Sequence, residues 1–325
     1  MSKPVVVVPG LQRRDGLEAL SQFATIKQWK EASPMPRDLL KEWLKDADAL
    51  WPVNKIQVDK DLLKDAKNIK VVAQSSVGYD NINVDDLTEL GIPFGNTPDV
   101  LTETVAELAF TLVVCASRRI VENAAFVTSG AWGKNKQPIK GFDLSRRTIG
   151  IVGLGKIGLS ISRRARAFGM TVLYHNRHQR SDDSLYMTTY VSMDELLAKS
   201  DVVLVMAPLT EETYHLFDET AFKKMKKTAL FVNVGRGKIV DTDALAKALE
   251  TGEIDYAALD VTDPEPLPGN HPLLQTGKCL VVPHIGSYTD RTRHDMVMLT
   301  VENIRNGLNK HPLTTCVNEE VNYKA

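Results

Sequence analysis

The chain has 325 residues, of which 43% are hydrophobic and 25% charged, and its formal net charge is −1. These values are typical of a globular protein with two domains of ordinary size, and they argue against general attraction to nucleic acid or to an anionic membrane. The apolar runs are strand-sized, no secretory signal is evident and only three cysteines are present, so we expect a cytoplasmic protein without disulfides.

Short apolar runs alternate with amphipathic segments of helical length, which predicts an α/β protein with parallel sheets. In the first part of the chain the predicted strands are Val5–Val8, Ala49–Trp51, Lys70–Gln74 and Ile92–Gly95. Predicted helices lie near Gly16–Phe23, Arg37–Lys45 and Asp59–Ala66. We interpret this part as a doubly wound lobe.

A second lobe begins after Thr97-Pro98 with a long apolar helix, Leu101–Arg119, which we expect to be buried in a domain or subunit interface. The segment Gly130–Phe142 has weak periodicity and is predicted to be an extended excursion. Strands separated by helices are then predicted at Thr148–Val152, Thr171–Tyr174, Val202–Met206, Leu230–Asn233, Ala257–Val261 and Leu280–Val282. This alternation is what a dinucleotide-binding sheet requires. A last helix, about Asp290–Leu308, can return to the first lobe.

A glycine-rich turn, with the sequence Gly153-Leu154-Gly155-Lys156-Ile157-Gly158, stands between a predicted strand and a predicted helix. Glycines allow a tight turn, a close approach of pyrophosphate to the backbone and close packing of helix on strand. The helix N-terminus then presents free N–H groups and the positive end of its dipole to the phosphates. The turn therefore predicts a dinucleotide site, although a glycine-rich turn can also be purely structural.

The strand after this turn indicates which dinucleotide is bound. NAD enzymes usually have Asp or Glu about 20 residues past the glycine turn, where the carboxylate binds the ribose hydroxyls. This chain has Asn176-Arg177 there and no acidic residue before Asp182. Arg177 can bind a 2′-phosphate through two charge-assisted hydrogen bonds, with support from Asn176 and Arg180. We therefore predict a preference for NADP(H), with NAD(H) possible and a solvated basic turn as the structural alternative; no metal site is predicted.

Three of the later predicted strands are followed by Arg236, Glu265 and His284. In open α/β sheets, ligands bind beyond the carboxyl ends of the strands. Reduction of a 2-keto acid needs a cation for the carboxylate and carbonyl, a proton donor, and a partner that orients the donor and favours its charged form. Arginine, histidine and glutamate supply these functions in that order. Each residue alone could be structural, as a surface turn, a solvated charge or a buried histidine, but their joint occurrence favours catalysis.

A further candidate site lies in the first lobe, where the strand Lys70–Gln74 is followed by the turn Ser75–Asp80. Successive N–H groups in such a turn can form a nest that holds a carboxylate. Most turns of this kind bind nothing, so the pattern alone is a weak indication.

These residues, in this order, resemble the D-isomer-specific 2-hydroxyacid dehydrogenase family, and most closely its glyoxylate/hydroxypyruvate reductases. The resemblance covers nearly the whole chain. The matching stretches are SVGYDN at Ser76–Asn81, TPDVLTETVAEL at Thr97–Leu108, GLGKIG, NVGRG, LDVTDPEPLPGNHPLL at Leu259–Leu274 and PHIGSYTDRTR at Pro283–Arg293. The last two are long and specific.

The resemblance implies a Rossmann dinucleotide-binding domain, residues 101–289, inserted into a flavodoxin-like substrate domain formed by residues 1–100 and 290–325. It implies reduction of glyoxylate or hydroxypyruvate by NADPH in a cleft between the lobes, with His284 as proton donor. The substrate-binding residues that it implies are Val77 and Gly78, through their backbone, together with Arg236 and Ser287.

The resemblance also implies a set of residues around the cofactor: Thr104, Gly153, Leu154, Gly155, Lys156, Ile157, Gly158, Asn176, Arg177, Pro208, Val234, Asp260 and Gly286. It implies a homodimer built by the long helix and the arm after it, in which Trp132 could reach the partner's active site. The chain departs from the family pattern where Met206-Ala207-Pro208 lacks a frequent histidine and where Lys156 replaces a common arginine. A larger substrate such as 2-ketogluconate, and a dinucleotide-sensing protein related to corepressors, stay open as alternatives.

Overall fold

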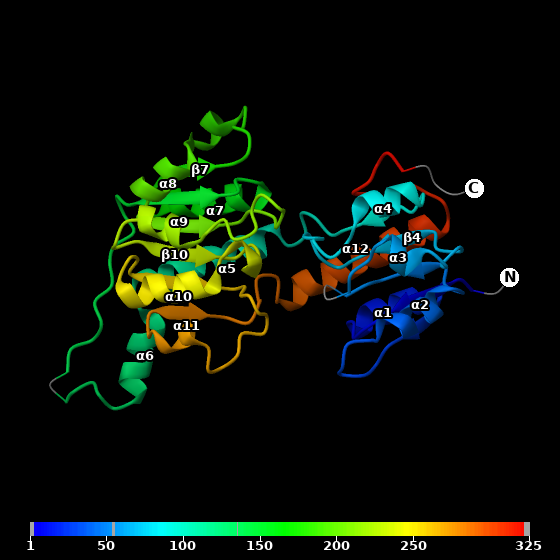
Figure 1. Ribbon diagram of the computed structural model, residues 1–325, viewed down its shortest axis with the longest axis horizontal. Coiled ribbons are helices and arrows are strands. Elements are labelled where there is room, and N and C mark those ends of the chain that lie inside the picture. The colour runs from blue at the N-terminus through cyan, green and yellow to red at the C-terminus, as the bar shows by residue number, and fades with distance from the viewer. Residues whose placement is uncertain (1–2, 54–55, 135, 322–325) are drawn as a thin grey trace. The chain divides into compact units, whose positions relative to one another are not determined.

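The computed structural model describes residues 3–53, 56–134 and 136–321. The chain forms two compact units: unit 1 comprises Met1–Leu101 and Thr289–Ala325, and unit 2 comprises Thr102–Tyr288. Each unit contains one parallel sheet with helices on its faces (Figure 1), so the predicted fold class is confirmed. The assignment of the dinucleotide to unit 2 and of the substrate to unit 1 stays a prediction.

The sheet of unit 1 has the strand order β2-β1-β3-β4-β5, with every neighbouring pair parallel. This is the flavodoxin-like order. The strands are β1 (Val5–Val8), β2 (Thr25–Gln28), β3 (Ala49–Leu50), β4 (Val71–Ala73) and β5 (Phe94–Gly95). The sequence did not predict β2, because this edge strand pairs only with β1 and is not fully buried, and its sequence TIKQ lacks a continuous apolar run.

The helices of unit 1 are α1 (Arg14–Ser21), α2 (Arg37–Leu44), α3 (Lys60–Leu63), α4 (Val84–Glu89) and α12 (Asp290–Leu308). Helix α12 comes from the end of the chain but packs beside α1 and on β4. One apolar cluster contains residues of α1 and α12, and a second contains residues of α2, α3 and α4. The two clusters take alternate residues of β1, so they cover opposite faces of the sheet.

The sheet of unit 2 has the order β12-β11-β10-β9-β6-β7-β8 and is also parallel throughout. The strands are β6 (Thr148–Val152), β7 (Thr171–His175), β8 (Thr189–Tyr190), β9 (Val202–Val205), β10 (Leu230–Asn233), β11 (Tyr256–Leu259) and β12 (Cys279–Val281). Strand order reverses between β6 and β9, which makes the carboxyl end of β6 the expected dinucleotide site. Only the two-residue strand β8 was not predicted.

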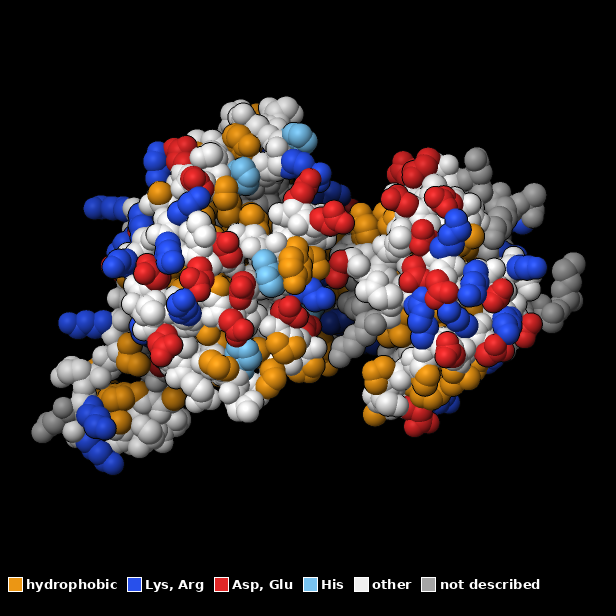
Figure 2. All heavy atoms as spheres, in the orientation of Figure 1, with side chains coloured by type: hydrophobic (Ala, Val, Ile, Leu, Met, Phe, Trp, Pro, Cys, Tyr) orange, Lys and Arg blue, Asp and Glu red, His pale blue; other side chains and the backbone are white. Residues whose placement is uncertain are grey.

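The helices of unit 2 are α5 (Thr102–Ser117), α6 (Ile120–Thr128), α7 (Lys156–Ala167), α8 (Met193–Lys199), α9 (Glu219–Lys224), α10 (Thr242–Thr251) and α11 (Pro272–Gln275), with short 3₁₀ helices η1 (Asp183–Tyr186) and η2 (Gly237–Ile239). Helix α5 packs against α7, β10 and β11. Helix α6 was not predicted, and none of its residues is buried. Figure 2 shows hydrophobic side chains gathered over it. Among the described residues, no helix is long and apolar enough to cross a membrane.

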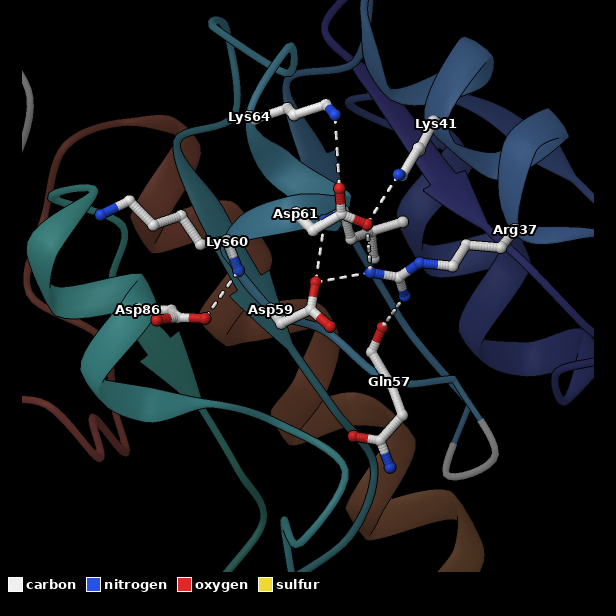
Figure 3. A network of polar contacts seen from close by, with 9 residues as sticks. Arg37, Lys41, Gln57, Asp59, Lys60, Asp61, Lys64 and Asp86 are labelled. Atoms are coloured by element: carbon white, nitrogen blue, oxygen red, sulfur yellow. Dashed lines mark hydrogen bonds and ion pairs between the residues drawn. The ribbon is translucent and has the colours of Figure 1, made fainter.

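An ion-pair network joins α2 and α3 on the surface of unit 1 (Figure 3). Arg37 contacts both Asp59 and Asp61, while Lys41 and Lys64 reach Asp61 at 2.7 and 3.3 Å. Hydrogen bonds from Lys41, Arg37 and Lys64 hold the pKa of Asp61 below its ordinary value. Because all these side chains are partly exposed, each pair contributes little alone, and the network serves to tie two helices together.

Candidate active site

The predicted catalytic residues follow three strands that are neighbours in the sheet of unit 2. Strand β11 pairs with β10 on one side and with β12 on the other, all in parallel. The carboxyl ends of parallel neighbours lie at the same edge of a sheet. Arg236, Glu265 and His284 therefore leave the sheet from adjacent positions at one edge.

His284 and Glu265 are in direct contact. Nδ1 of His284 lies 2.7 Å from Oε1 of Glu265, and the two side chains are 40% and 43% exposed. Partial burial acts to raise the pKa of Glu265, but the hydrogen bond and charge of His284, helped by the charge of Arg236, outweigh it and lower that pKa. Glu265 is thus a carboxylate at neutral pH, and it lies close enough to Arg236 for the guanidinium charge to lower its pKa.

The backbone around His284 is held by Asp260 at the end of β11. The Asp260 side chain is buried, and its two oxygens accept hydrogen bonds from the N–H groups of Ile285 at 2.6 Å and Gly286 at 2.9 Å. The N–H of His284 donates to the Asp260 carbonyl at 2.9 Å. His284 has a φ of +53°, a left-handed conformation that is uncommon outside glycine and marks a sharp turn. Burial raises the pKa of Asp260 despite these donors, and the geometry assigns it to positioning the turn.

The segment around Arg236 is fixed by Asn233, the last residue of β10. The Asn233 side chain accepts from the N–H of Gly235 at 3.0 Å and donates to the Arg236 carbonyl at 2.9 Å. A Cβ on Gly237 would lie 2.0 Å from the Thr262 carbonyl oxygen, so only glycine allows the loop after β10 to approach the loop after β11 this closely. The Gly-Arg-Gly sequence is therefore explained by packing that brings Arg236 toward the Glu265 loop.

The glycine turn after β6 has the geometry expected of a pyrophosphate site. Gly153 has a φ of +100°, and a Cβ there would lie 2.6 Å from the Ala207 N. Gly155 begins α7 with open space around its Cα, and α7 has neither a side-chain cap nor an acidic residue in its first turn. An anion can satisfy the N–H groups of such a helix start. The residues present therefore fit a dinucleotide, whose site would be formed here.

The residues predicted at the ribose end of this site, Asn176, Arg177 and Arg180, already have partners within the protein. The Asn176 side chain accepts a hydrogen bond from the Leu154 N–H at 2.6 Å. Arg177 is 70% exposed and its Nη1 lies 3.6 Å from Oε2 of Glu212. Arg180, which the sequence suggested as a supporting phosphate contact, makes two hydrogen bonds to Asp182, at 2.8 and 2.7 Å. Of the two arginine side chains, that of Arg177 is the more exposed, at 70% against 27% for Arg180.

The remaining residues predicted around the cofactor and substrate lie at several places in unit 2. The Val234 N–H donates to Val205 at 3.2 Å, and the Pro208 carbonyl accepts from the Thr213 hydroxyl at 2.7 Å. Thr104 lies in the first turn of α5, and Ser287 lies in the turn after β12. Leu154, Lys156, Ile157 and Gly158 belong to the glycine turn and the start of α7. Their roles stay predictions.

The predicted carboxylate-binding turn is in unit 1, after β4. Ser76 Oγ and Gln74 Nε2 donate to the Gly78 carbonyl at 2.6 and 3.3 Å, and Asn96 Nδ2 donates to the Val77 carbonyl at 3.0 Å. Within the described part of the chain, the N–H groups of Val77 and Gly78 have no hydrogen-bond acceptor. With its carbonyls held by side chains, the turn leaves two donors for an anion.

The buried amides behind this turn were missed in the sequence. Gln74 and Asn81, 1% and 4% exposed, exchange hydrogen bonds at 2.9 and 3.1 Å between their side chains. A glutamine at the end of an apolar strand was the available signal, because a buried amide needs polar partners. The partner, however, is brought there only by the fold.

Comparison with known proteins agrees with this arrangement. Residues 110–286 match the family model described as D-isomer specific 2-hydroxyacid dehydrogenase, NAD binding domain. The chain is 41% identical over 310 residues to the glyoxylate reductase of Aeropyrum pernix, covering 94% of this chain and 92% of that protein. It is 41% identical over 305 residues to the human glyoxylate reductase/hydroxypyruvate reductase, covering 92% of this chain and 93% of that one.

A solved structure extends the likeness to three dimensions. The NADPH-dependent glyoxylate/hydroxypyruvate reductase of Sinorhizobium meliloti, in complex with NADP and malonate, superposes with a TM-score of 0.90 at 30% identity. The superposition covers 100% of this chain and 99% of that one. By family model, sequence and fold, this protein belongs to the D-isomer-specific 2-hydroxyacid dehydrogenases and is an NAD(P)-dependent oxidoreductase.

Proposed function

We propose that the protein reduces glyoxylate, hydroxypyruvate or a similar small 2-keto acid to the D-2-hydroxy acid, with NADPH as the preferred reductant. The observation that carries the proposal is the His284–Glu265 contact at 2.7 Å beside Arg236, at the carboxyl ends of adjacent strands. Relatives that share about 40% of the sequence over nearly the whole chain carry names for this activity.

Each residue has a defined task in this reaction. Arg236 and the N–H groups of Val77 and Gly78 hold the substrate carboxylate, because both supply donors to an anion. When bound, the reduced nicotinamide supplies the hydride that C2 of the keto acid accepts. His284 gives a proton to the carbonyl oxygen, which becomes the hydroxyl. Since Nδ1 faces Glu265, Nε2 is the ring nitrogen that donates, and the carboxylate stabilises the imidazolium and fixes the ring.

The preference for NADPH rests on the end of β7. Asn176 and Arg177 stand where an NAD enzyme usually has an acidic residue, and the Arg177 guanidinium is exposed to an incoming 2′-phosphate. NADH stays a possible second reductant.

The protein is further proposed to act as a homodimer through α6 and the segment after it. Ile120, Val121 and Val127 on α6 are 50%, 48% and 50% exposed, and Trp132 is 73% exposed. An exposed apolar stretch of this extent is typical of a subunit interface.

The direct test is kcat/KM for glyoxylate, hydroxypyruvate and 2-ketogluconate with NADPH and with NADH, together with the configuration of the product. His284→Ala should lower kcat by about 10²- to 10⁴-fold and leave NADPH binding intact, because only proton donation is lost. His294→Ala is the matched control, since His294 Nδ1 also contacts a carboxylate, Asp15, at 2.8 Å but in unit 1. Near-normal kcat in His284→Ala would contradict the assignment, and tight NADPH binding without turnover of any keto acid would favour a dinucleotide-sensing role.

A further inference from the structure

An ion pair crosses the end of the strand that carries the glycine turn. Arg177 follows β7 and Glu212 lies in the loop after β9, and their side chains are 3.6 Å apart. In the sheet, β6 pairs with β7 on one side and with β9 on the other. Because β6 lies between the two loops, the Arg177–Glu212 pair spans the carboxyl end of β6, which is the expected seat of the dinucleotide.

The backbone on both sides of this pair is held in place. Thr213 Oγ1 accepts from the Thr210 N–H at 2.8 Å and donates to the Pro208 carbonyl at 2.7 Å, which closes a tight turn around Glu212. The residue before Arg177, Asn176, accepts from the Leu154 N–H, and its carbonyl accepts from the Tyr190 hydroxyl at 3.3 Å. These contacts fix the backbone from which the Arg177 and Glu212 side chains project, and the two side chains themselves are 70% and 69% exposed.

Recognition of a 2′-phosphate depends on Arg177, because the nearby Arg180 is already paired with a carboxylate. Arg180 is neutralised by Asp182 through two hydrogen bonds, and a third joins its Nη1 to the Leu154 carbonyl at 3.3 Å. The Arg180–Asp182 pair thus supports the glycine turn. A phosphate at the end of β7 would meet the Arg177 guanidinium and, beside it, the carboxylate of Glu212.

We propose that Glu212 is a specificity-determining residue that weakens the preference for NADP(H) over NAD(H). Its carboxylate competes with the 2′-phosphate for Arg177 and repels that phosphate, while it has no such effect on a neutral ribose hydroxyl. Glu212 therefore weakens the binding of NADP(H) and leaves the binding of NAD(H) unchanged. The inference rests on the proposed function, because it assumes that the dinucleotide binds at the glycine turn.

The test measures the Kd of NADPH and the Kd of NADH for the whole protein, with the fluorescence of each dinucleotide as the signal of binding. Glu212→Gln should lower the Kd for NADPH by about 3- to 5-fold, the size expected for one exposed charge pair, and leave the Kd for NADH unchanged. The difference should shrink in about 0.5 M salt, which screens exposed charges. Glu211→Gln is the matched control, because the neighbouring Glu211 makes no ion pair or hydrogen bond among the described residues.

The same substitution in a protein that lacks Arg177 separates the effect of the Arg177–Glu212 ion pair from a general effect of the Glu212 charge. In an Arg177→Ala protein, Glu212→Gln should relieve only the repulsion and so change the Kd for NADPH by less than 2-fold. An unchanged ratio of the two Kd values in Glu212→Gln, or an equal change for both dinucleotides, would overturn the inference while the proposed function stands. Failure of the unmodified protein to bind either dinucleotide would instead overturn the proposed function.

Discussion

The carboxyl ends of the two sheets carry polar groups of different kinds. In unit 2 they are ionisable side chains on accessible loops, with His284 and Glu265 40% and 43% exposed. In unit 1 they are neutral amides and a hydroxyl packed around a backbone turn, with Gln74, Asn81 and Asn96 between 1% and 8% exposed. A charged group that must exchange protons or bind an anion cannot be sealed from solvent at low cost, whereas hydrogen-bonded amides can be buried. The difference agrees with the proposed roles, which give reacting side chains to unit 2 and a carboxylate-binding backbone turn to unit 1.

Charge by itself does not mark the site. The Arg37–Asp59–Asp61 network of unit 1 is richer in ion pairs than the His284–Glu265 pair, yet it joins the surfaces of two helices (Figure 3). The position at the ends of adjacent parallel strands is what distinguishes His284 and Glu265.

The largest effect in this comparison is expected on the unit 2 side, from Glu265→Gln. This substitution leaves the His284 imidazole without its charged partner and should lower kcat by about 10²-fold. The pKa of Glu265 is lowered in the folded protein, so its charge is present above that value and lost as the pH falls through it. The wild-type acid limb should therefore lie below the range of a free glutamate.

The pH profile of kcat for keto-acid reduction checks this prediction. In Glu265→Gln the acid limb should disappear, because the carboxyl group whose protonation produces it has been removed. Asp263→Asn removes a carboxylate from the same loop, where the Asp263 side chain makes no hydrogen bond or ion pair among the described residues, and should leave the profile unchanged. Identical profiles for Glu265→Gln and wild type would remove Glu265 from the mechanism.

A smaller effect is expected in unit 1 from Ser76→Ala. The hydroxyl that donates to the Gly78 carbonyl at 2.6 Å is lost, so the turn should be less rigid and the KM for the keto acid should rise about 3- to 10-fold, for a hydrogen bond worth about 1 kcal/mol. The kcat and the Kd for NADPH should stay within 2-fold of wild type. Ser75→Ala is the control, because its hydroxyl contacts Thr300 and Trp51 instead of the turn. A fall in kcat at constant KM would mean that the turn does more than bind.

The smallest effect on chemistry is expected from Val121→Asp, which tests whether unit 2 also carries the subunit contact. A charge on the exposed apolar face of α6 should shift the protein from dimer to monomer in sedimentation experiments, with a modest change in kcat. Leu185→Asp, at a residue that is 78% exposed in η1, should leave the assembly unchanged. A monomeric wild-type protein would contradict the proposed dimer.

Local patterns in the chain were sufficient to predict much of the fold. The bounds of β1, β6, β10 and α12 follow directly from apolar runs and helical periodicity, because these signals depend on a few consecutive residues. Elements with short or polar sequences, such as β2 and β8, lack that signal and form because a neighbouring strand offers hydrogen bonds. Motifs also gave the glycine turn and Arg236, Glu265 and His284 as candidates, and the structure places Glu265 and His284 in contact.

Contacts between residues distant in the chain came only from the folded arrangement. Glu265 meets His284 because β11 and β12 are neighbours, and Arg177 meets Glu212 because β7 and β9 flank β6. Strand order and loop packing set these distances, and no local periodicity encodes them. The residue types in the sequence were therefore sufficient to predict the chemistry of the site. Which charged side chains pair with one another was decided by which strands lie side by side in the folded protein.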